Sequence, residues 1–390
     1  MSPPPPLKRA SLRRFLPLAA FLLALEIGLA PVAAHVRAAS LLLRFADEHA
    51  TGGLAGLGRH AVDEELLDFE TVNGPARGRI YRPRGVSAAP SSVGSVVLVH
   101  GVHRLGIEEP RLTRFARALA SSGLVVLTPQ VEEIADYRVD PRSIDTIGAA
   151  AAALDARTSG RAGVMGMSFA GGLSLLAAAD PRYAAGIGFV VAIGGHHDLA
   201  RVSRFFATNQ IDRPDGSTTH LEAHGYGALV LIYGRIERFF SAEDAPAARD
   251  AIRLWLWDDR PAARLRAEAL SPEGKATMAI VLDGRADQLA PEMLAVIERD
   301  RAGMGQVSPR GHLAGMGVPV FLLHGAGDTV IPSAETEWIA REVPPAMLRS
   351  ALVSPALVHV ELGPGTPAGQ QWDIVHFMAG VLEEAEATGH

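Results

Sequence analysis

The sequence predicts an α/β protein in which a mostly parallel, twisted sheet of about eight strands carries helices on both faces and an inserted helical cap. Three observations favour this class. Apolar runs rich in Val, Ile and Leu alternate with segments of helical periodicity over residues 95–193. Helical patterns rich in Ala and Arg replace this alternation over about residues 198–306. Strand patterns then return at residues 318–324 and 349–354.

Each expected element has its own local signal. Two strands, over residues 66–72 and 77–81, are expected to pair as an antiparallel edge. The β-branched run from Ser95 to His100 is typical of a strand that is buried on both faces. The same reasoning predicts strands at residues 124–128, 162–167 and 187–193, and helices over residues 110–121, 143–156 and 169–179. An amphipathic helix that carries Ile374, Phe377, Val381 and Leu382 on one face follows the last strand.

Composition points to small-molecule chemistry. The chain has 390 residues and a net charge of −6, which gives no electrostatic reason to expect nucleic acid as a partner. It contains no cysteine, so disulfides, thiolate metal sites and a cysteine nucleophile are excluded. We therefore expect a small molecule as the partner and leave the oligomeric state open.

The N-terminal region predicts export. Basic residues between positions 8 and 14 precede the apolar run 15–25, as in a signal peptide. Val32 and Ala34 fit a cleavage after Ala34, but residues 15–36 are also long enough to form a membrane anchor. Residues 1–36 are thus a signal peptide or an anchor, and the location is periplasmic or extracellular. Residues 37–64 are expected to be a connector, before one domain over residues 65–390 with its cap at about 198–306.

A glycine-rich turn marks the first candidate catalytic residue. The stretch from Gly166 to Gly172 contains Ser168 and lies between a buried strand and an apolar helix. A Gly-x-Ser-x-Gly turn in this context forms a nucleophile elbow, in which small neighbours let a strained serine project from the sheet. Ala170 replaces the last glycine of that pattern, and Gly171 follows it. The alternative is an ordinary strand-to-helix turn in which the serine caps the helix.

An earlier strand end supplies the candidate oxyanion hole. His100-Gly101-Val102-His103 follows the first parallel strand, where the backbone N–H of Val102 can pair with that of Phe169 beside the serine. Two fixed donors stabilise the oxyanion that develops during acyl transfer. His100 is expected to support the loop structurally. The alternative is that His-Gly merely ends a strand.

The orienting acid is predicted at Asp328. It follows the buried strand predicted at residues 318–324, after a Gly-rich turn, and Pro332 comes soon after it. This arrangement holds a carboxylate just beyond the carboxyl end of a strand. Asp198, at another strand end, is the alternative acid and lacks the turn and the proline.

The general base is predicted at His359. A serine, acid, histidine order requires a histidine after residue 328, which leaves His359, His376 and His390. His376 lies in the final amphipathic helix, where a structural role is expected. His359 follows the strand at residues 349–354 across a short turn, and we therefore favour it.

Together, Gly166-Met-Ser168, His100-Gly101 and His324-Gly-Ala-Gly-Asp328 resemble the α/β-hydrolase superfamily over about residues 65–390, in its esterase, lipase or dienelactone-hydrolase-like branch. The resemblance implies the α/β-hydrolase fold and a carboxylic ester hydrolase that works through a Ser-His-Asp triad and an acyl-enzyme, without a cofactor. An acyltransferase on the same fold and an inactive membrane-tethered binding or scaffold protein are the alternatives.

Three histidines raise the question of a metal site. His103, His196 and His197 are expected at the same edge of the sheet. Metal ligation needs side chains that converge, which spacing alone does not indicate. We therefore predict no metal, and pairing with Asp198 or packing under the cap is the more ordinary role.

Overall fold

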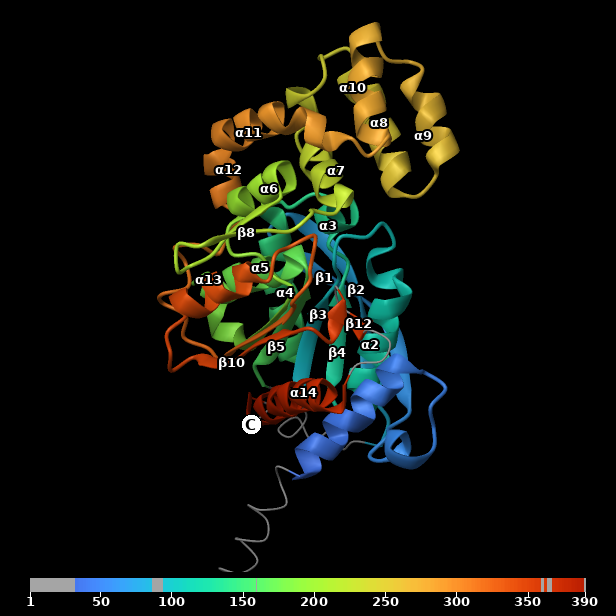
Figure 1. The fold of residues 1–390 in the computed structure, drawn as a ribbon. Helices are drawn as coiled ribbons and strands as arrows, with labels where there is room; N and C mark the ends of the chain where they lie inside the picture. Colours follow the sequence, from blue (N-terminus) through green and yellow to red (C-terminus); the bar gives the residue numbers. More distant parts are fainter. Residues whose placement is uncertain (1–31, 86–93, 159, 359–360, 363–366, 389–390) are drawn as a thin grey trace, which may run out of the picture.

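The computed structural model describes residues 32–85, 94–158, 160–358, 361–362 and 367–388. Its centre is an eight-stranded sheet in the order β1-β2-β4-β3-β5-β6-β9-β10 (Figure 1). β2 pairs antiparallel with β1 and β4, and the other neighbours pair parallel. The strands are β1 (Val62–Thr71), β2 (Gly74–Pro83), β3 (Ser95–Val99), β4 (Val125–Pro129), β5 (Ala162–Met167), β6 (Ile187–Ile193), β9 (Val320–Gly325) and β10 (Leu348–Ser354).

Helices connect the parallel strands and cover the sheet. The helices of the body are α2 (Pro110–Ser121), α3 (Glu132–Ala135), α4 (Arg142–Thr158), α5 (Phe169–Ala179), α13 (Ala334–Glu342) and α14 (Ala368–Thr388). A short antiparallel pair, β11 (Leu357–Val358) and β12 (Glu361–Leu362), lies between β10 and α14. This strand order is that of the α/β-hydrolase fold, so the predicted fold class is confirmed.

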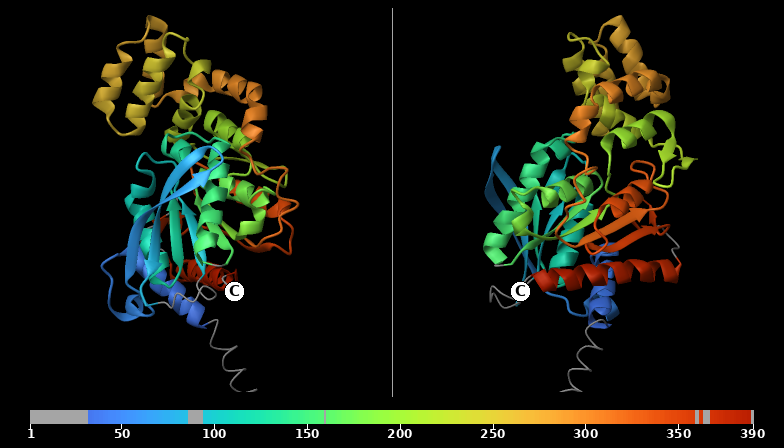
Figure 2. Two further views of the ribbon diagram at one scale, coloured as in Figure 1. Left: turned by 180° about the vertical axis from the view of Figure 1, so that it is seen from behind. Right: turned by 90° about the vertical axis from the view of Figure 1, so that its left-hand side faces the viewer.

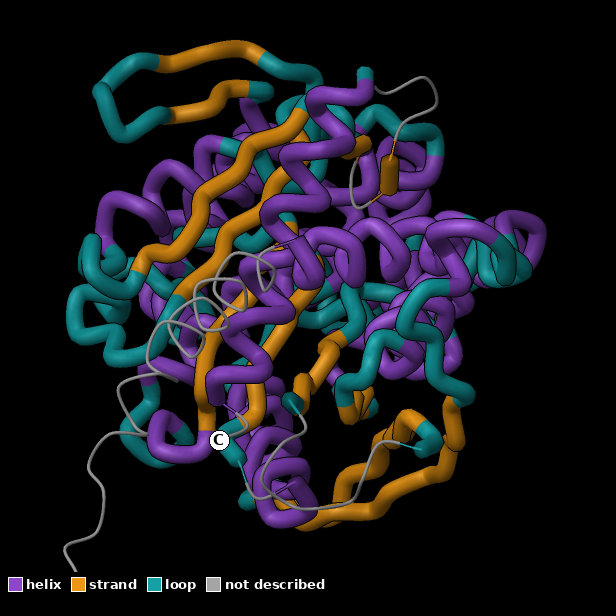
Figure 3. Tube along the Cα trace, turned by 90° about the horizontal axis from the view of Figure 1, so that it is seen from below, coloured by secondary structure: helices purple, strands orange, loops and turns teal. Residues whose placement is uncertain are grey.

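The sheet divides the body into two apolar layers. Because successive side chains of a strand point to opposite faces, neighbouring residues enter different cores. Val97 and Val190 pack on the face that α4 and α5 cover. Val96 and Phe189 pack on the opposite face, with α2 and α14. The view from below shows helices on both sides of the strands (Figure 3).

A helical cap follows β6 and stands over one end of the sheet. It contains α6 (Leu199–Thr208), α7 (Gly225–Tyr233), α8 (Ala245–Leu256), α9 (Arg260–Ala267), α10 (Pro272–Leu282), α11 (Ala290–Arg299) and α12 (Arg301–Gly305). The hairpin of β7 (Gln210–Asp212) and β8 (Thr218–His220) joins α6 to α7. α8, α9 and α10 lie farthest from the sheet in Figure 1 and in the two views of Figure 2. The cap occupies the stretch where the strand and helix alternation of the sequence breaks.

The segment that we expected to be a connector, residues 37–64, differs most from the prediction. Residues 32–46 form a helix, and Ala38 and Leu41 on it are fully buried against α2 and α14. The 3-10 helix Gly53–Gly56 follows, and β1 begins at Val62. This part of the chain belongs to the packed body and does not act as a separate linker.

Polar contacts fix the N-terminal helix as firmly as its apolar ones. Arg44 is 5% exposed, and its guanidinium donates to Ser40 Oγ (2.6 Å), the Ala55 carbonyl (2.9 Å) and Ser122 Oγ (2.8 Å). Arg37 forms an ion pair with Glu386 of α14, and the two helices lie side by side in Figures 1 and 2. Buried charge is tolerated here because both terminal nitrogens of the guanidinium have hydrogen-bonding partners, whereas Nε has none in the described chain.

The targeting prediction falls mainly outside the described residues, which begin at residue 32. Within the described part of the chain, no helix combines the length and apolarity that crossing a bilayer requires.

Two leucines of the N-terminal helix test its packing. Leu41 is fully buried, whereas Leu43 is 44% exposed. We expect Leu41→Ala to lower the free energy of unfolding by about 2–4 kcal/mol, because it leaves a cavity in the core. Leu43→Ala on the same helix should change it by less than about 0.5 kcal/mol. Chemical denaturation measures both, and equal small effects would show that the helix does not dock.

Candidate active site

Ser168 sits in a strained turn between β5 and α5. Its φ of +56° and ψ of −132° lie outside the regions that a serine normally adopts. Two backbone hydrogen bonds hold this geometry: the Ser168 N–H donates to the Ile193 carbonyl at 2.7 Å, and its carbonyl accepts from the Gly171 N–H at 2.8 Å. Strain of this kind persists only where the surroundings enforce it, and it concentrates at functional sites.

Two glycines make the turn possible. A Cβ on Gly166 would lie 2.3 Å from the Ala170 carbonyl oxygen, and one on Gly172 would lie 2.4 Å from the His196 ring. Neither position has room for a side chain. Ala170, where the sequence departs from the usual pattern, is fully buried and packs in the main core. Ala170 therefore fits the turn. The positions that leave no room for a side chain are Gly166 and Gly172.

The loop after β3 runs beside the serine. A Cβ on Gly101 would lie 3.7 Å from Ser168 Cβ, and Val102 lines the same cavity as Ser168. Phe169 is the first residue of α5, so its N–H is one of the donors that a helix start leaves unused. Within the described chain, neither the Val102 N–H nor the Phe169 N–H has a hydrogen-bond acceptor.

His100 supports this loop, as expected. It is 1% exposed; its Nδ1 donates to the Gly101 carbonyl at 2.8 Å, and its Nε2 accepts from the Val131 N–H at 3.1 Å. Burial lowers the pKa of His100 to about 4, so the ring is neutral at physiological pH. A neutral ring is what these two hydrogen bonds require.

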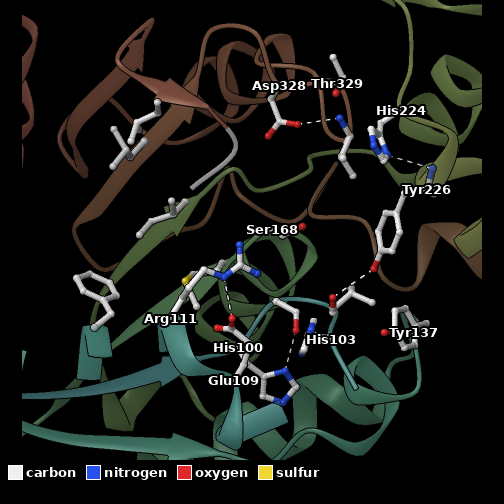
Figure 4. Close-up of a pocket in the computed structure, with 18 of the residues that line it drawn as sticks. His100, His103, Glu109, Arg111, Tyr137, Ser168, His224, Tyr226, Asp328 and Thr329 are labelled. Atoms are coloured by element: carbon white, nitrogen blue, oxygen red, sulfur yellow. Dashed lines mark hydrogen bonds and ion pairs between the residues drawn. The ribbon is translucent and has the colours of Figure 1, made fainter. Parts of the chain in front are cut away.

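Asp328 follows β9, and backbone N–H groups hold its carboxylate. Its side chain is 3% exposed, and Oδ1 accepts from the N–H groups of Val330 (2.8 Å) and Ile331 (3.0 Å). Oδ2 lies 3.6 Å from Nε2 of His324, a buried ring that also contacts the Ile331 carbonyl at 2.8 Å. Asp328 and Ser168 line one cavity of about 520 Å³ (Figure 4).

His359, the expected base, lies outside the described residues. Leu357, two residues before it on β11, lines the Ser168 cavity. The alternative base, His376, is exposed and its Nδ1 lies 2.9 Å from His35 Nε2 on the N-terminal helix. His376 is not among the residues that line the Ser168 cavity in the described chain.

Asp198, the alternative acid, serves a different purpose. It caps α6 by accepting from the Ala200 N–H at 2.9 Å, and its Oδ2 pairs with Arg310 at 2.8 Å. It lines a second cavity, between α6 and α13, which does not include Ser168. The structure therefore brings Asp328, and not Asp198, together with the serine.

The cavity wall combines body and cap, and several of its residues carry no sequence signal. Phe45 from the N-terminal helix and Phe115 from α2 give it apolar surface. Tyr137 and the cap residue Tyr226 add two phenol groups (Figure 4). These residues lie in no motif, and only the fold brings them to Ser168.

An ion pair between Arg111 and Glu109 lines the cavity. Arg111 Nε lies 2.7 Å from Glu109 Oε1, and the Leu112 N–H donates to Glu109 Oε2 at 2.8 Å. Burial alone would raise the pKa of Glu109, but these hydrogen bonds outweigh it and hold the pKa below its usual value. Glu109 is therefore ionised at neutral pH and keeps Arg111 paired.

The three histidines that raised the question of a metal lie in different surroundings. His103 lines the Ser168 cavity, His196 bonds the Val307 carbonyl at 2.7 Å, and His197 contacts Glu342 at 2.6 Å. Burial lowers the pKa of all three rings. In the parts of the chain that the structure describes, no group of His, Asp or Glu converges as metal ligands do.

The fold, the strained serine and the buried acid on one cavity define an α/β-hydrolase architecture. No family model and no curated protein matches the sequence. Structures with a similar chain path include an acylaminoacyl peptidase from Pyrococcus horikoshii, with 12% identity and a TM-score of 0.44 over 76% of this chain and 37% of that one. An esterase from Pyrobaculum calidifontis has 15% identity and a TM-score of 0.43 over 90% and 91% of the two chains.

Brefeldin A esterase, a bacterial homologue of human hormone-sensitive lipase, has 15% identity and a TM-score of 0.46 over 92% of this chain and 86% of that one. This chain spans only 37% of the length of the Pyrococcus peptidase and 40% of a second acylaminoacyl peptidase. Similarity at this level assigns no activity.

The low pKa of His100 predicts acid sensitivity of the fold. An unfolded histidine titrates near pH 6.5, so between about pH 6.5 and pH 4 the unfolded chain binds more protons. The free energy of unfolding therefore falls as the pH falls through that window, by about 2 kcal/mol at pH 5 from this residue. His100→Gln keeps a donor and an acceptor but does not titrate, and should show a correspondingly smaller loss between pH 7.5 and pH 5.

The control is His49→Gln, because the His49 side chain is 89% exposed. Denaturant titrations at the two pH values measure the loss. An unchanged pH dependence in His100→Gln would contradict the assignment of His100 as a buried neutral ring.

Proposed function

We propose that the protein is a serine hydrolase of carboxylic esters, with Ser168 as nucleophile, His359 as general base and Asp328 as the acid that orients it. One observation carries the proposal: a serine strained at φ +56° shares a cavity with a buried, backbone-held carboxylate. The N–H groups of Val102 and Phe169 flank that serine. A purely structural turn gains nothing from such strain.

The chemistry proceeds in two halves. His359 removes the proton of the Ser168 hydroxyl, and Oγ attacks the ester carbonyl carbon. The carbonyl oxygen becomes an oxyanion that accepts from the N–H groups of Val102 and Phe169, while the positive end of α5 adds a favourable field. The alcohol then leaves with the proton from the imidazolium. Water, activated by the same histidine, cleaves the acyl-enzyme and releases the acid.

The position of β11 supports His359 as the base. β11 ends at Val358, and Leu357 on it is part of the cavity wall. Asp328 forms another part of that wall. His359 follows β11 directly in the chain, and this closeness in sequence to the cavity wall is why we propose it as the base. The chain order Ser168, Asp328, His359 is also that of the α/β-hydrolases.

An ester with an apolar acyl or aryl group suits the cavity. Phe45, Phe115, Ile193 and Leu357 supply apolar surface, and the volume of about 520 Å³ matches a small organic molecule. The same acyl-enzyme can form from an amide, or pass its acyl group to an alcohol, so these reactions are separate outcomes of the assay.

We also propose that the protein is exported and keeps its N-terminal segment as a membrane anchor. Ala34 is 5% exposed and packs in the core with α2 and α14. Cleavage after Ala34 would remove a packed residue from the helix over residues 32–46. Retention of the segment avoids that loss.

N-terminal sequencing of the protein recovered from membrane and soluble fractions tests the anchor. We expect the membrane fraction to hold chains that begin well before Ala34. A soluble periplasmic or secreted form that begins at His35 would identify a cleaved signal peptide instead.

A fluorophosphonate probe tests the nucleophile. We expect the wild type to be labelled and to hydrolyse short-chain nitrophenyl esters, and Ser168→Ala to lose both together. Ser174→Ala is the matched control, because Ser174 lies on α5 and its buried hydroxyl has no partner in the described chain. Replacing His359 with Ala should lower kcat by roughly a thousandfold or more, whereas His376→Ala should not change it.

The outcomes separate the alternatives. Absence of labelling in a well-folded wild type would favour an inactive binding or scaffold protein. Formation of a new ester in the presence of an added alcohol, faster than hydrolysis, would identify an acyltransferase. Cleavage of aryl amides in preference to esters would identify a peptidase-like enzyme.

A further inference from the structure

The start of α7 in the cap touches both loops of the candidate active site. The His224 N–H donates to the carbonyl of Thr329, the residue after Asp328, at 2.8 Å. The Tyr226 hydroxyl donates to the carbonyl of Val102 at 3.2 Å. Figure 4 shows Tyr226 reaching from the cap towards the loop beside Ser168. One turn of the cap therefore spans the acid loop and the oxyanion loop.

The Tyr226 hydroxyl stays protonated and can therefore donate its hydrogen bond to Val102 over a wide pH range. Burial raises the pKa of Tyr226, so the phenol keeps its proton at any working pH. Its ring meets the ring of Tyr137 edge-on, with centroids 6.2 Å apart and planes at 62°. Tyr137 has a φ of +58°, a strained value for a bulky residue, and its hydroxyl donates to the Leu256 carbonyl at 3.0 Å.

Further hydrogen bonds join the cap to the body at Asp136, the residue before Tyr137. Asp136 Oδ1 accepts from the Tyr233 hydroxyl at 2.8 Å and from Arg253 Nε at 3.1 Å. Tyr233 ends α7 and Arg253 belongs to α8. The cap is therefore also bound to the loop that carries Asp136, through hydrogen bonds that do not involve Tyr226 or Val102.

The hydrogen bond from Tyr226 to the Val102 carbonyl affects the direction in which the Val102 N–H, the proposed oxyanion donor, points. The Val102 carbonyl belongs to the peptide that joins Val102 to His103, and fixing that peptide limits the rotation of Val102. The Val102 N–H has no acceptor in the described chain to orient it. An oxyanion donor contributes only if it points at the developing charge before the reaction.

We propose that Tyr226 is a positioning residue that holds the Val102 carbonyl so that the Val102 N–H points at the oxyanion. The cap therefore completes the oxyanion hole, in addition to covering the cavity. This inference rests on the proposed serine hydrolase function and concerns a residue outside the triad.

Tyr226→Phe tests the inference, because it removes the hydroxyl and keeps the ring. Loss of a whole oxyanion donor costs about 10²–10³ in kcat, so a misdirected donor should cost roughly tenfold, with KM within about twofold. The rate of fluorophosphonate labelling should fall by a similar factor. The matched control is Tyr233→Phe on the same helix, which removes a hydroxyl from the cap contact without touching the Val102 loop.

Hydrogen exchange supplies a readout that does not depend on activity. Amide exchange over residues 99–105 should be faster in Tyr226→Phe than in the wild type or Tyr233→Phe, while thermal melts show that all three are folded. Equal kcat in Tyr226→Phe and Tyr233→Phe, a change confined to KM, or unchanged loop exchange would overturn the inference. A wild type that the probe does not label would instead overturn the hydrolase function itself, with loop exchange still reporting on the hydrogen bond.

Discussion

The left-handed backbone of Ser168 is the constraint on which the rest of the site depends. It requires bare glycine at positions 166 and 172, where side chains would collide with the Ala170 carbonyl and the His196 ring. It also requires β6 to supply a carbonyl acceptor through Ile193. The pairing of β5 with β6 and the start of α5 are thus parts of one unit, and the cavity, the oxyanion loop and the acid loop are arranged around it.

The cap adds a second level of organisation. Residues near the start of α7 join the two loops that carry Val102 and Asp328, and the end of α7 joins the loop at Asp136. Rigid placement of polar groups is what makes electrostatic stabilisation effective in an active site. The cap is thus bound to three loops, which carry Val102, Asp328 and Asp136, and it restrains all three. One of these contacts is made to the backbone of Val102, beside Ser168.

The sequence predicted those features of the fold that short stretches of the chain determine. The strand ends, the tight turn at Ser168 and the position of Asp328 just after β9 follow from short stretches of glycines and apolar runs. Tyr226 and Phe45 could not be found in this way, because they reach the cavity from positions remote in the chain. The N-terminal helix was missed because its buried face includes Arg44. The charge of Arg44 interrupts the apolar pattern, and two of its hydrogen-bond partners, Ala55 and Ser122, lie outside the helix.

The ion pair between Arg37 and Glu386 joins residues that are 349 positions apart. The N-terminal helix therefore cannot reach its final partner until the ribosome has added α14. Contacts of such long separation form late and slow the folding of a chain. During synthesis, the part of this helix that packs on α14 has no partner there until α14 has been made. The helix over residues 32–46 is therefore among the first parts of the described chain to be made and among the last to be fully packed.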